Sequence, residues 1–151
     1  MLVRNRVEKE YSLLYENHNL GLTPFSPLKQ GILTGKYNNG IPSDSRWANS
    51  DDDFIKSTKA RFETEEFKKE AKKVAALGPI AERLGVSQAG LAMAWVLKNP
   101  HVAAAITGAS RPEQVWDSIK AIGVLPKMTE EVMKEIDDIL ENKPEPLVRR
   151  F

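Results

Sequence analysis

Two short apolar runs, residues 21–25 and residues 102–106, constrain the fold of this chain most strongly. Each is too short for a helix, is bounded or interrupted by proline or glycine, and is followed by helical periodicity. We therefore expect two buried strands, each leading into helices, which is typical of a parallel sheet in an α/β fold. Two parallel strands do not make an independent core, because each leaves unpaired backbone groups on its outer edge. Although 151 residues is about the length of one domain, the pattern predicts part of a larger, helix-rich fold.

The remaining periodic segments predict helices, and several carry local start or stop signals. Helices are expected over residues 3–14, 64–84, 87–99, 110–123 and 129–142. Gly78-Pro79 predicts a kink in the second of these helices. Ser87 is placed as an N-cap, and Ser110 with Glu113 fits a capping box.

Two of these helices carry apolar stripes that should face inward. In the first helix the stripe consists of Val3, Val7, Tyr11 and Leu14. In the helix over 110–123 it consists of Val115, Ile119 and Ile122.

Residues 29–62 are rich in Gly, Asn, Asp, Ser and Pro and show no sustained period. We expect a long loop, and a loop of this length is usually functional or disordered. The chain is otherwise interpreted as one region, 1–151, with no internal repeat.

The composition excludes several classes of function. Lys plus Arg (22) nearly balances Asp plus Glu (21), and no block of like charge could follow a phosphate backbone, so nucleic acid is not an expected partner. No run of 18 apolar residues or signal-like start is present, which favours a cytoplasmic protein without membrane insertion. The absence of cysteine excludes disulfides, thiolate metal sites and cysteine nucleophiles within these residues.

Two segments that follow the expected strands are candidates for binding an anion. The turn 107–111 joins Gly108, Ser110 and Arg111 at a helix start, where free backbone N–H groups bind phosphate. Spacing alone favours the simpler interpretation that Ser110 only caps the helix. The segment 26–37 contains two glycines and two lysines but matches neither phosphate-loop spacing, so a flexible surface loop is the alternative.

No acid, base and nucleophile set emerges from the residues. His18 and His101 lack a carboxylate at useful spacing, and the three tryptophans are interpreted as packing residues.

The ordered motifs of this chain resemble the carboxy-terminal half of an aldo-keto reductase. They are Ser26-Pro27-Leu28, Thr34-Gly35-Lys36-Tyr37, Ser45-Arg46, Ile80–Gly85, Ala92–Trp95, Gly108-Ala109-Ser110 and Glu113-Gln114. The resemblance covers essentially the whole chain. Within the family it is similar to the branch that holds potassium channel beta subunits and fungal aryl-alcohol dehydrogenase-like proteins.

The resemblance implies a (β/α)8 barrel that reduces aldehydes and ketones to alcohols with NADPH, and it implies that the two strands are the seventh and eighth. TIM barrels commonly build a phosphate site from the loops after those strands. The residues implied to contact the nicotinamide and pyrophosphate are Phe25, Ser26, Pro27, Leu28, Lys36 and Tyr37. Those implied to hold the adenosine end with its 2′-phosphate are Arg46, Gly108, Ser110 and Gln114, with Asp117 and Ser118 near the adenine. The stretch 29–62 would then cover the cofactor.

Some features depart from the family pattern. Phe25 stands where similar proteins usually have Trp, and Asp117 and Ser118 replace Glu and Asn. The family's catalytic Asp, Tyr, Lys and His belong to the first half of the barrel and have no counterpart in this chain. We therefore expect a cofactor-binding half that is inactive alone, whose partners are NADPH and the missing half or another copy. The alternatives are a non-catalytic interaction protein like a channel beta subunit, or an inactive truncated relic.

Overall fold

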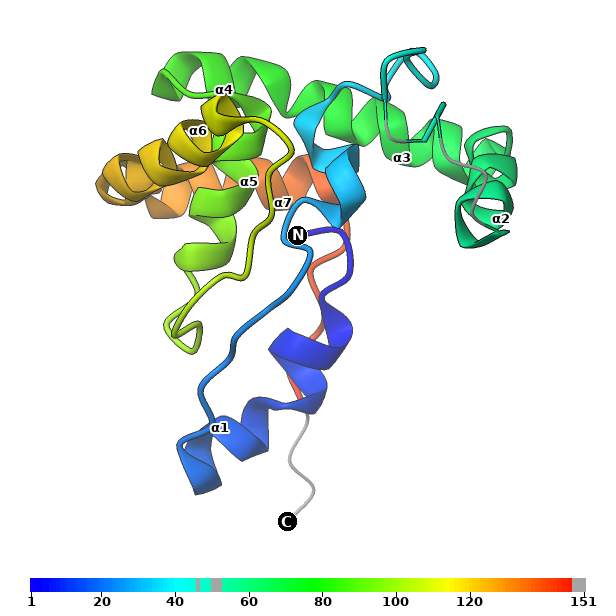
Figure 1. Ribbon diagram of the computed structural model, residues 1–151. Coiled ribbons are helices and arrows are strands. Elements are labelled where there is room, and N and C mark those ends of the chain that lie inside the picture. Colours follow the sequence, from blue (N-terminus) through cyan, green and yellow to red (C-terminus); the bar gives the residue numbers. More distant parts are fainter. Residues whose placement is uncertain (46, 50–52, 148–151) are drawn as a thin grey trace.

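The computed structural model describes residues 1–45, 47–49 and 53–147, which form a layer of packed helices with an elongated extension (Figure 1). The α-helices are α1 Ser12–His18, α2 Asp53–Phe62, α3 Glu65–Ala76, α4 Gly78–Leu84, α5 Gln88–Leu97, α6 Pro112–Val124 and α7 Glu130–Leu140. A π-helical turn, η1 Arg6–Glu10, precedes α1, and two 3₁₀ segments are η2 Lys29–Thr34 and η3 Leu125–Lys127.

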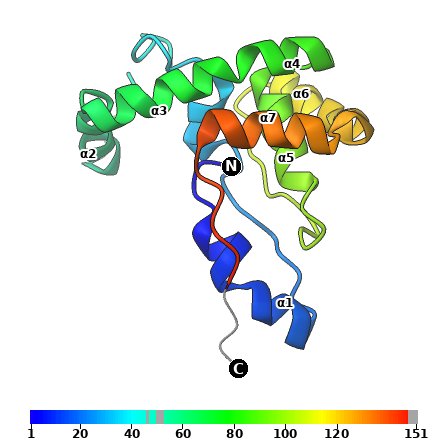
Figure 2. The same cartoon turned by 180° about the vertical axis from the view of Figure 1, so that it is seen from behind.

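The core lies where α5 packs against α6 and η2, and α3 packs against α7. Its most buried side chains include Val74, Ile80, Leu91, Met128 and Ile136, each at most 1% exposed. Figure 2 shows α7 running beside α3 and α4, with α1 at the far end of the extension. The helical layer is therefore the packed part of the chain.

Local sequence signals set most of the helix ends as expected. Ser87 Oγ accepts a hydrogen bond from the backbone N–H of Gly90 at 2.9 Å, which confirms it as the N-cap of α5. The helical segment that begins at residue 65 breaks at Leu77, between α3 and α4, next to Gly78-Pro79. Gly85 ends α4 in the left-handed conformation, with φ of +76°.

The two expected strands lie side by side but do not form a regular ladder. They make two isolated parallel bridges, Leu22 with Val102 and Phe25 with Ile106. The prediction that they are buried is wrong for this chain, since Phe25 is 82% and Ile106 55% exposed. Val102 and Ala105 still pack against the core, but the side chains of Phe25 and Ile106 are left uncovered, and parallel strands need both faces covered.

The first helix also differs from the expected one. The π-helical turn over residues 6–10 adds a residue per turn and so shifts the register of the side chains that follow. Val3 is 75% exposed and Leu14 39% exposed, whereas Tyr15, outside the predicted stripe, is 7% exposed. The apolar stripe that regular helical spacing predicted for this segment is therefore not its buried face.

Two further expectations are corrected by the helices that form. The stretch 29–62 is not loop throughout, because it contains η2 and α2. The predicted inward stripe of α6 lies outward instead, with Val115, Ile119 and Ile122 between 47% and 59% exposed. Ala121 and Val124 are the buried residues of that helix.

Candidate functional site

The carboxyl ends of the two strands place the two candidate loops next to each other. The backbone N–H of Ile106 donates to the carbonyl of Pro24 at 2.9 Å, beside the bridge between Phe25 and Ile106. The chain continues from one strand into the turn at Ser26 and from the other into Gly108. Ligands of α/β folds bind at this end of the strands.

The turn after the first strand is strained and internally hydrogen bonded. Ser26, Lys29 and Gln30 have φ of +53°, +47° and +55°, a backbone conformation that residues other than glycine rarely adopt. Ser26 Oγ accepts from the backbone N–H of Gln30 at 3.2 Å, and the Ser26 carbonyl accepts from Lys29 N–H at 2.8 Å. Strain of this kind persists where the surrounding structure holds it, and it concentrates at functional sites.

A buried tryptophan also forms a hydrogen bond with this turn. Trp47 Nε1 donates to the Gln30 carbonyl at 3.2 Å, and its side chain is 2% exposed. Sequence reasoning assigned Trp47 only to packing, and nothing in its local pattern indicates a bond 17 residues away.

The two lysines of the segment have different surroundings. Lys29 Nζ pairs with Glu70 of α3 at 2.7 Å, and Glu70 also pairs with Arg61 at 3.3 Å, so the Lys29 side chain is held against α3. Lys36 Nζ lies 4.8 Å from the centre of the Tyr37 ring, and its side chain is exposed. Lys36 is therefore the lysine of this turn that remains accessible to an anion.

Tyr37 is a core residue rather than part of an open surface. It is 2% exposed, and its ring lies 5.4 Å from that of Phe62 in an edge-on arrangement. Pro27 and Leu28 are half-buried, and Leu28 packs against the core. These three residues support the turn that carries Ser26 and Lys36.

The start of α6 differs from the predicted capping box. The helix begins at Pro112 and its N-cap is Arg111, so Ser110 lies one residue too early to cap it. Ser110 instead donates from its backbone N–H to Gln114 Oε1 at 2.8 Å and from its hydroxyl at 3.3 Å. The structure thus brings together two of the predicted site residues, and both are exposed.

Asp117 and Ser118 lie on α6 itself, and Gly108 precedes it. Ser118 Oγ donates to the Gln114 carbonyl at 2.9 Å, whereas Asp117 accepts from Ser87 at 2.5 Å and so faces α5. At Gly108 a Cβ atom would meet nothing within 4 Å, so the backbone there is open to a ligand.

An ion pair between Arg111 and Asp44, at 3.7 Å, links the start of α6 to the segment before Arg46. Arg46 itself lies outside the described residues. Sequence reasoning missed Asp44 and Glu70, because both act through partners distant in sequence.

The described residues provide no metal centre. Among residues 1–45, 47–49 and 53–147, no cluster of three or more His, Asp or Glu side chains could hold a metal ion. None of the described helices is long and apolar enough to cross a membrane.

Comparison with known proteins decides the family. The model of the aldo/keto reductase family matches residues 1–141. The chain belongs to the aldo/keto reductase family. The expected family is therefore confirmed, and the parallel bridges among many helices fit part of the (β/α)8 fold of aldo/keto reductases.

Individual members of the aldo/keto reductase family match over most of the chain. It is 44% identical over 145 residues to a probable voltage-gated potassium channel subunit beta of Arabidopsis thaliana, covering 95% of this chain and 42% of that protein. A putative voltage-gated potassium channel subunit beta of Schizosaccharomyces pombe is 42% identical over 143 residues, with 95% and 40% covered. The chain thus spans about two fifths of the length of these relatives.

A solved aldo/keto reductase structure is also similar. The glycerol dehydrogenase of Gluconobacter oxydans superposes with a TM-score of 0.59 at 27% identity, covering 91% of this chain and 39% of the other.

Proposed function

We propose that this chain is the carboxy-terminal, NADP(H)-binding part of an aldo/keto reductase that reduces aldehydes or ketones to alcohols. The parallel bridge between Phe25 and Ile106 carries the proposal, because it sets the two loops with the family's cofactor motifs side by side. The glycerol dehydrogenase that the fold resembles is an oxidoreductase by its name, which supports this reaction class.

The residues at the strand ends fit a dinucleotide. The strained turn at Ser26 offers backbone groups, Lys36 offers an accessible cation, and the open backbone at Gly108 allows close approach. Ser110 and Gln114 would hold the adenosine end after their mutual hydrogen bond opens. Bound NADPH supplies the hydride that reduces the carbonyl carbon.

The chain's own residues orient the cofactor but leave proton donation to another part of the barrel. Reduction of a carbonyl needs a donor for the developing alkoxide. Phe25, 82% exposed at the strand end, would form a wall beside the nicotinamide. We propose that the catalytic groups come from the preceding barrel strands, which lie outside these 151 residues.

The exposed apolar face of α6 supports the proposal that other parts of the barrel pack against this chain. Val115, Trp116, Ile119 and Ile122 are 47–66% exposed and lie on one helix. Contiguous apolar surface of this kind marks an interaction site. In the proposed function it packs against the rest of the barrel or, in this chain alone, against a second copy.

Titration of NADPH and NADH, followed by reduced-nicotinamide fluorescence, tests the proposal. We expect saturable binding that favours NADPH, and Lys36→Ala should weaken it about tenfold or more, as expected for loss of a charge-assisted contact. Lys120→Ala, which removes an exposed lysine from the middle of α6, is the matched control and should leave affinity unchanged. Absence of binding at millimolar cofactor, with a cooperative thermal melt, would reject cofactor binding by this chain; a non-cooperative melt would favour an inactive relic.

The names of the relatives favour a second candidate, a non-catalytic subunit that binds a channel. A pull-down with the soluble domain of a potassium channel distinguishes the two. The enzyme proposal predicts no retention, whereas retention that Trp116→Lys abolishes would favour the interaction protein.

A further inference from the structure

The turn over residues 37–40 contains Asn39-Gly40, the only Asn-Gly pair in the sequence. The backbone nitrogen that follows an asparagine is able to attack the side-chain amide carbon. Glycine in the following position favours this attack, because it has no side chain to shield the nitrogen or restrict the backbone. Both residues are exposed. The turn therefore presents to solvent an asparagine that is suited to chemical modification.

The side-chain amide of Asn39 is not held by the fold. It makes no hydrogen bond within the described part of the chain. Other asparagines differ in this respect: Asn49 Nδ2 donates to the Ser43 carbonyl at 2.8 Å, and Asn142 Nδ2 donates to the Met1 carbonyl at 3.0 Å. A held amide must break its bonds before its carbon reaches a nucleophile, and Asn39 has no such bond to break.

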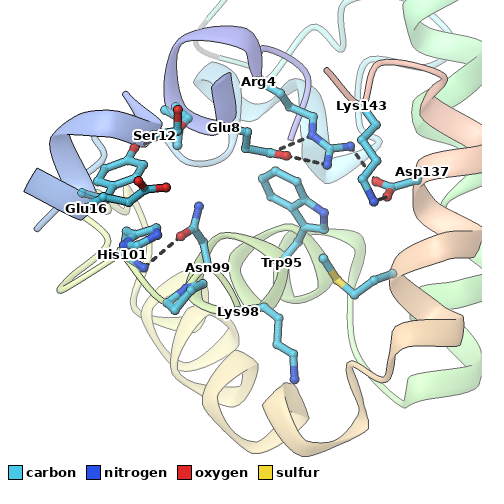
Figure 3. Close-up of a pocket in the computed structure, with 14 residues that line it drawn as sticks. Arg4, Glu8, Ser12, Glu16, Trp95, Lys98, Asn99, His101, Asp137 and Lys143 are labelled. Atoms are coloured by element: carbon cyan, nitrogen blue, oxygen red, sulfur yellow. Dashed lines mark hydrogen bonds and ion pairs between the residues drawn. The ribbon is translucent and has the colours of Figure 1, made fainter. Parts of the chain in front are cut away.

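Asn99 shows the opposite case. It borders a cavity of about 430 Å³ at the end of α5, where its side chain is bonded to the neighbouring backbone (Figure 3). Asn99 Oδ1 accepts from the backbone N–H of His101 at 2.9 Å. Pro100 follows Asn99 and has no N–H with which to attack. Both the hydrogen bond and the covalent structure therefore protect Asn99.

The attacking nitrogen of Gly40 lies in an open part of the turn. Gly40 has φ of +110°, and a Cβ there would meet nothing within 4 Å. Its N–H donates to the Tyr37 carbonyl at 3.2 Å, a long bond of its kind. This bond has to open before the nitrogen attacks. Tyr37 and Ile41 pack in or against the core, so the opening is confined to the exposed residues between them.

The surroundings of Asn39 favour the build-up of negative charge. Asn39 borders a cavity of about 470 Å³ that is also lined by charged side chains, namely Lys68, Lys69 and Lys72 of α3 together with Glu63 and Glu65. Three lysines against two glutamates leave an excess of positive charge. The attack places negative charge on the amide oxygen, and neighbouring cations stabilise such a charge. The same cations would face a carboxylate formed at residue 39.

We propose that Asn39 is a site of self-modification, at which the chain converts asparagine to aspartate and isoaspartate. The Gly40 nitrogen bonds to Asn39 Cγ, the Cγ–Nδ2 bond breaks, and the Gly40 proton leaves with Nδ2 as ammonia. Water then opens the cyclic imide at either carbonyl. One opening gives aspartate, and the other gives isoaspartate, in which the main chain runs through the former side chain. Nothing is oxidised or reduced in these steps.

The conversion changes the turn that follows Lys36. Each product adds one negative charge, so the formal net charge of the chain falls from +1 to 0. Isoaspartate also lengthens the main chain by a methylene between Tyr37 and Ile41, which are held by the core. Any effect on NADPH binding rests on the proposed function, whereas the modification itself does not.

Mass spectrometry of the ageing chain tests the proposal. The folded chain is kept at neutral pH in H₂¹⁸O without cofactor, and samples are digested with trypsin in ordinary water. We expect the peptide 37–46 to gain a carboxylate carrying ¹⁸O at residue 39, and an isoaspartate methyltransferase should label part of it. The rate should lie within about tenfold of that in a synthetic peptide 37–46, because opening one hydrogen bond slows a step by about that factor at most.

The controls lie in the same chain. Asn39→Gln keeps an amide but would have to close a larger ring, so it should gain no carboxylate. Asn38 is followed by asparagine instead of glycine, and Asn49 is held by the fold, so both should keep their amides. An Asn39 amide that survives while the synthetic peptide converts would overturn the proposal. Equal conversion at Asn38 or Asn49 would also overturn it, because it would indicate general ageing of an unfolded chain.

Discussion

Arg4 Nη1 donates to Asp137 Oδ1 at 2.6 Å across 133 residues of sequence and so joins the start of the chain to α7. Arg4 is 5% exposed, and the Asp137 side chain is 12% exposed. Asp137→Asn should lower the free energy of unfolding by about 1.5–3 kcal/mol, the usual contribution of a hydrogen bond to a charged group. Urea unfolding followed by circular dichroism measures this. Glu131→Gln, an exposed carboxylate on the same helix, is the control and should change stability little.

The same carboxylate predicts a pH dependence. Burial would raise the pKa of Asp137, but hydrogen bonds from Lys143 and Arg4 outweigh it and lower the pKa below its ordinary value of 3.8. Because the folded pKa is depressed, the stabilisation is present above the unfolded value and is lost as pH falls through the folded one. The stability difference between the original chain and Asp137→Asn should therefore be constant near neutral pH and shrink in strong acid. A difference that grew on acidification would contradict this assignment.

Two serines at helix starts should respond differently to the same substitution. Ser87→Ala should cost about 1 kcal/mol, because Ser87 caps α5 and also bonds to Asp117. Ser110→Ala should be close to neutral, since Ser110 is exposed and caps no helix. Thermal melts of both variants measure the contrast, and equal losses would argue against the observed start of α6.

Two glycines also form a matched pair. Gly35 has φ of +80°, and a Cβ there would collide with the side-chain amide of Gln88, which donates to the Val74 carbonyl at 2.5 Å. Gly35→Ala should therefore destabilise the chain by more than about 1 kcal/mol. Gly123 lies in the last turn of α6, where a Cβ meets nothing within 4 Å, so Gly123→Ala should stabilise by about 0.5–1 kcal/mol. Opposite signs in denaturant unfolding are the expected result.

Arg46 provides a test of cofactor selectivity. The family resemblance assigns it to the 2′-phosphate that distinguishes NADPH from NADH. Arg46→Ala should weaken NADPH binding about ten- to a hundredfold, as expected for a lost charge-assisted contact, and leave NADH binding unchanged. Arg83→Ala removes an exposed arginine that pairs with Glu135 and is the control. Equal losses for both cofactors would remove Arg46 from the phosphate site.

Local patterns in the sequence determined those features that neighbouring residues control. The cap at Ser87, the break at Gly78-Pro79 and the two extended runs depend on backbone conformation and on groups within a few residues. The motifs also determined the family, because several short motifs follow one another along the chain in the order that the family has. Predicting these features did not require knowing which distant parts of the chain are in contact.

Tertiary structure alone decided which side chains are accessible. The pairing of Lys29 with Glu70 and the bond from Trp47 to Gln30 join residues that are distant in sequence, so no spacing predicts them. The π-helical turn at η1 shifted the buried residue to Tyr15. The exposure of Phe25 and of the apolar face of α6 depends on which elements are present to cover them, and a periodic pattern shows only that such a face exists. For that reason the sequence by itself identified the family and the candidate cofactor residues, whereas the fold decided that Lys36 is accessible and Tyr37 is buried.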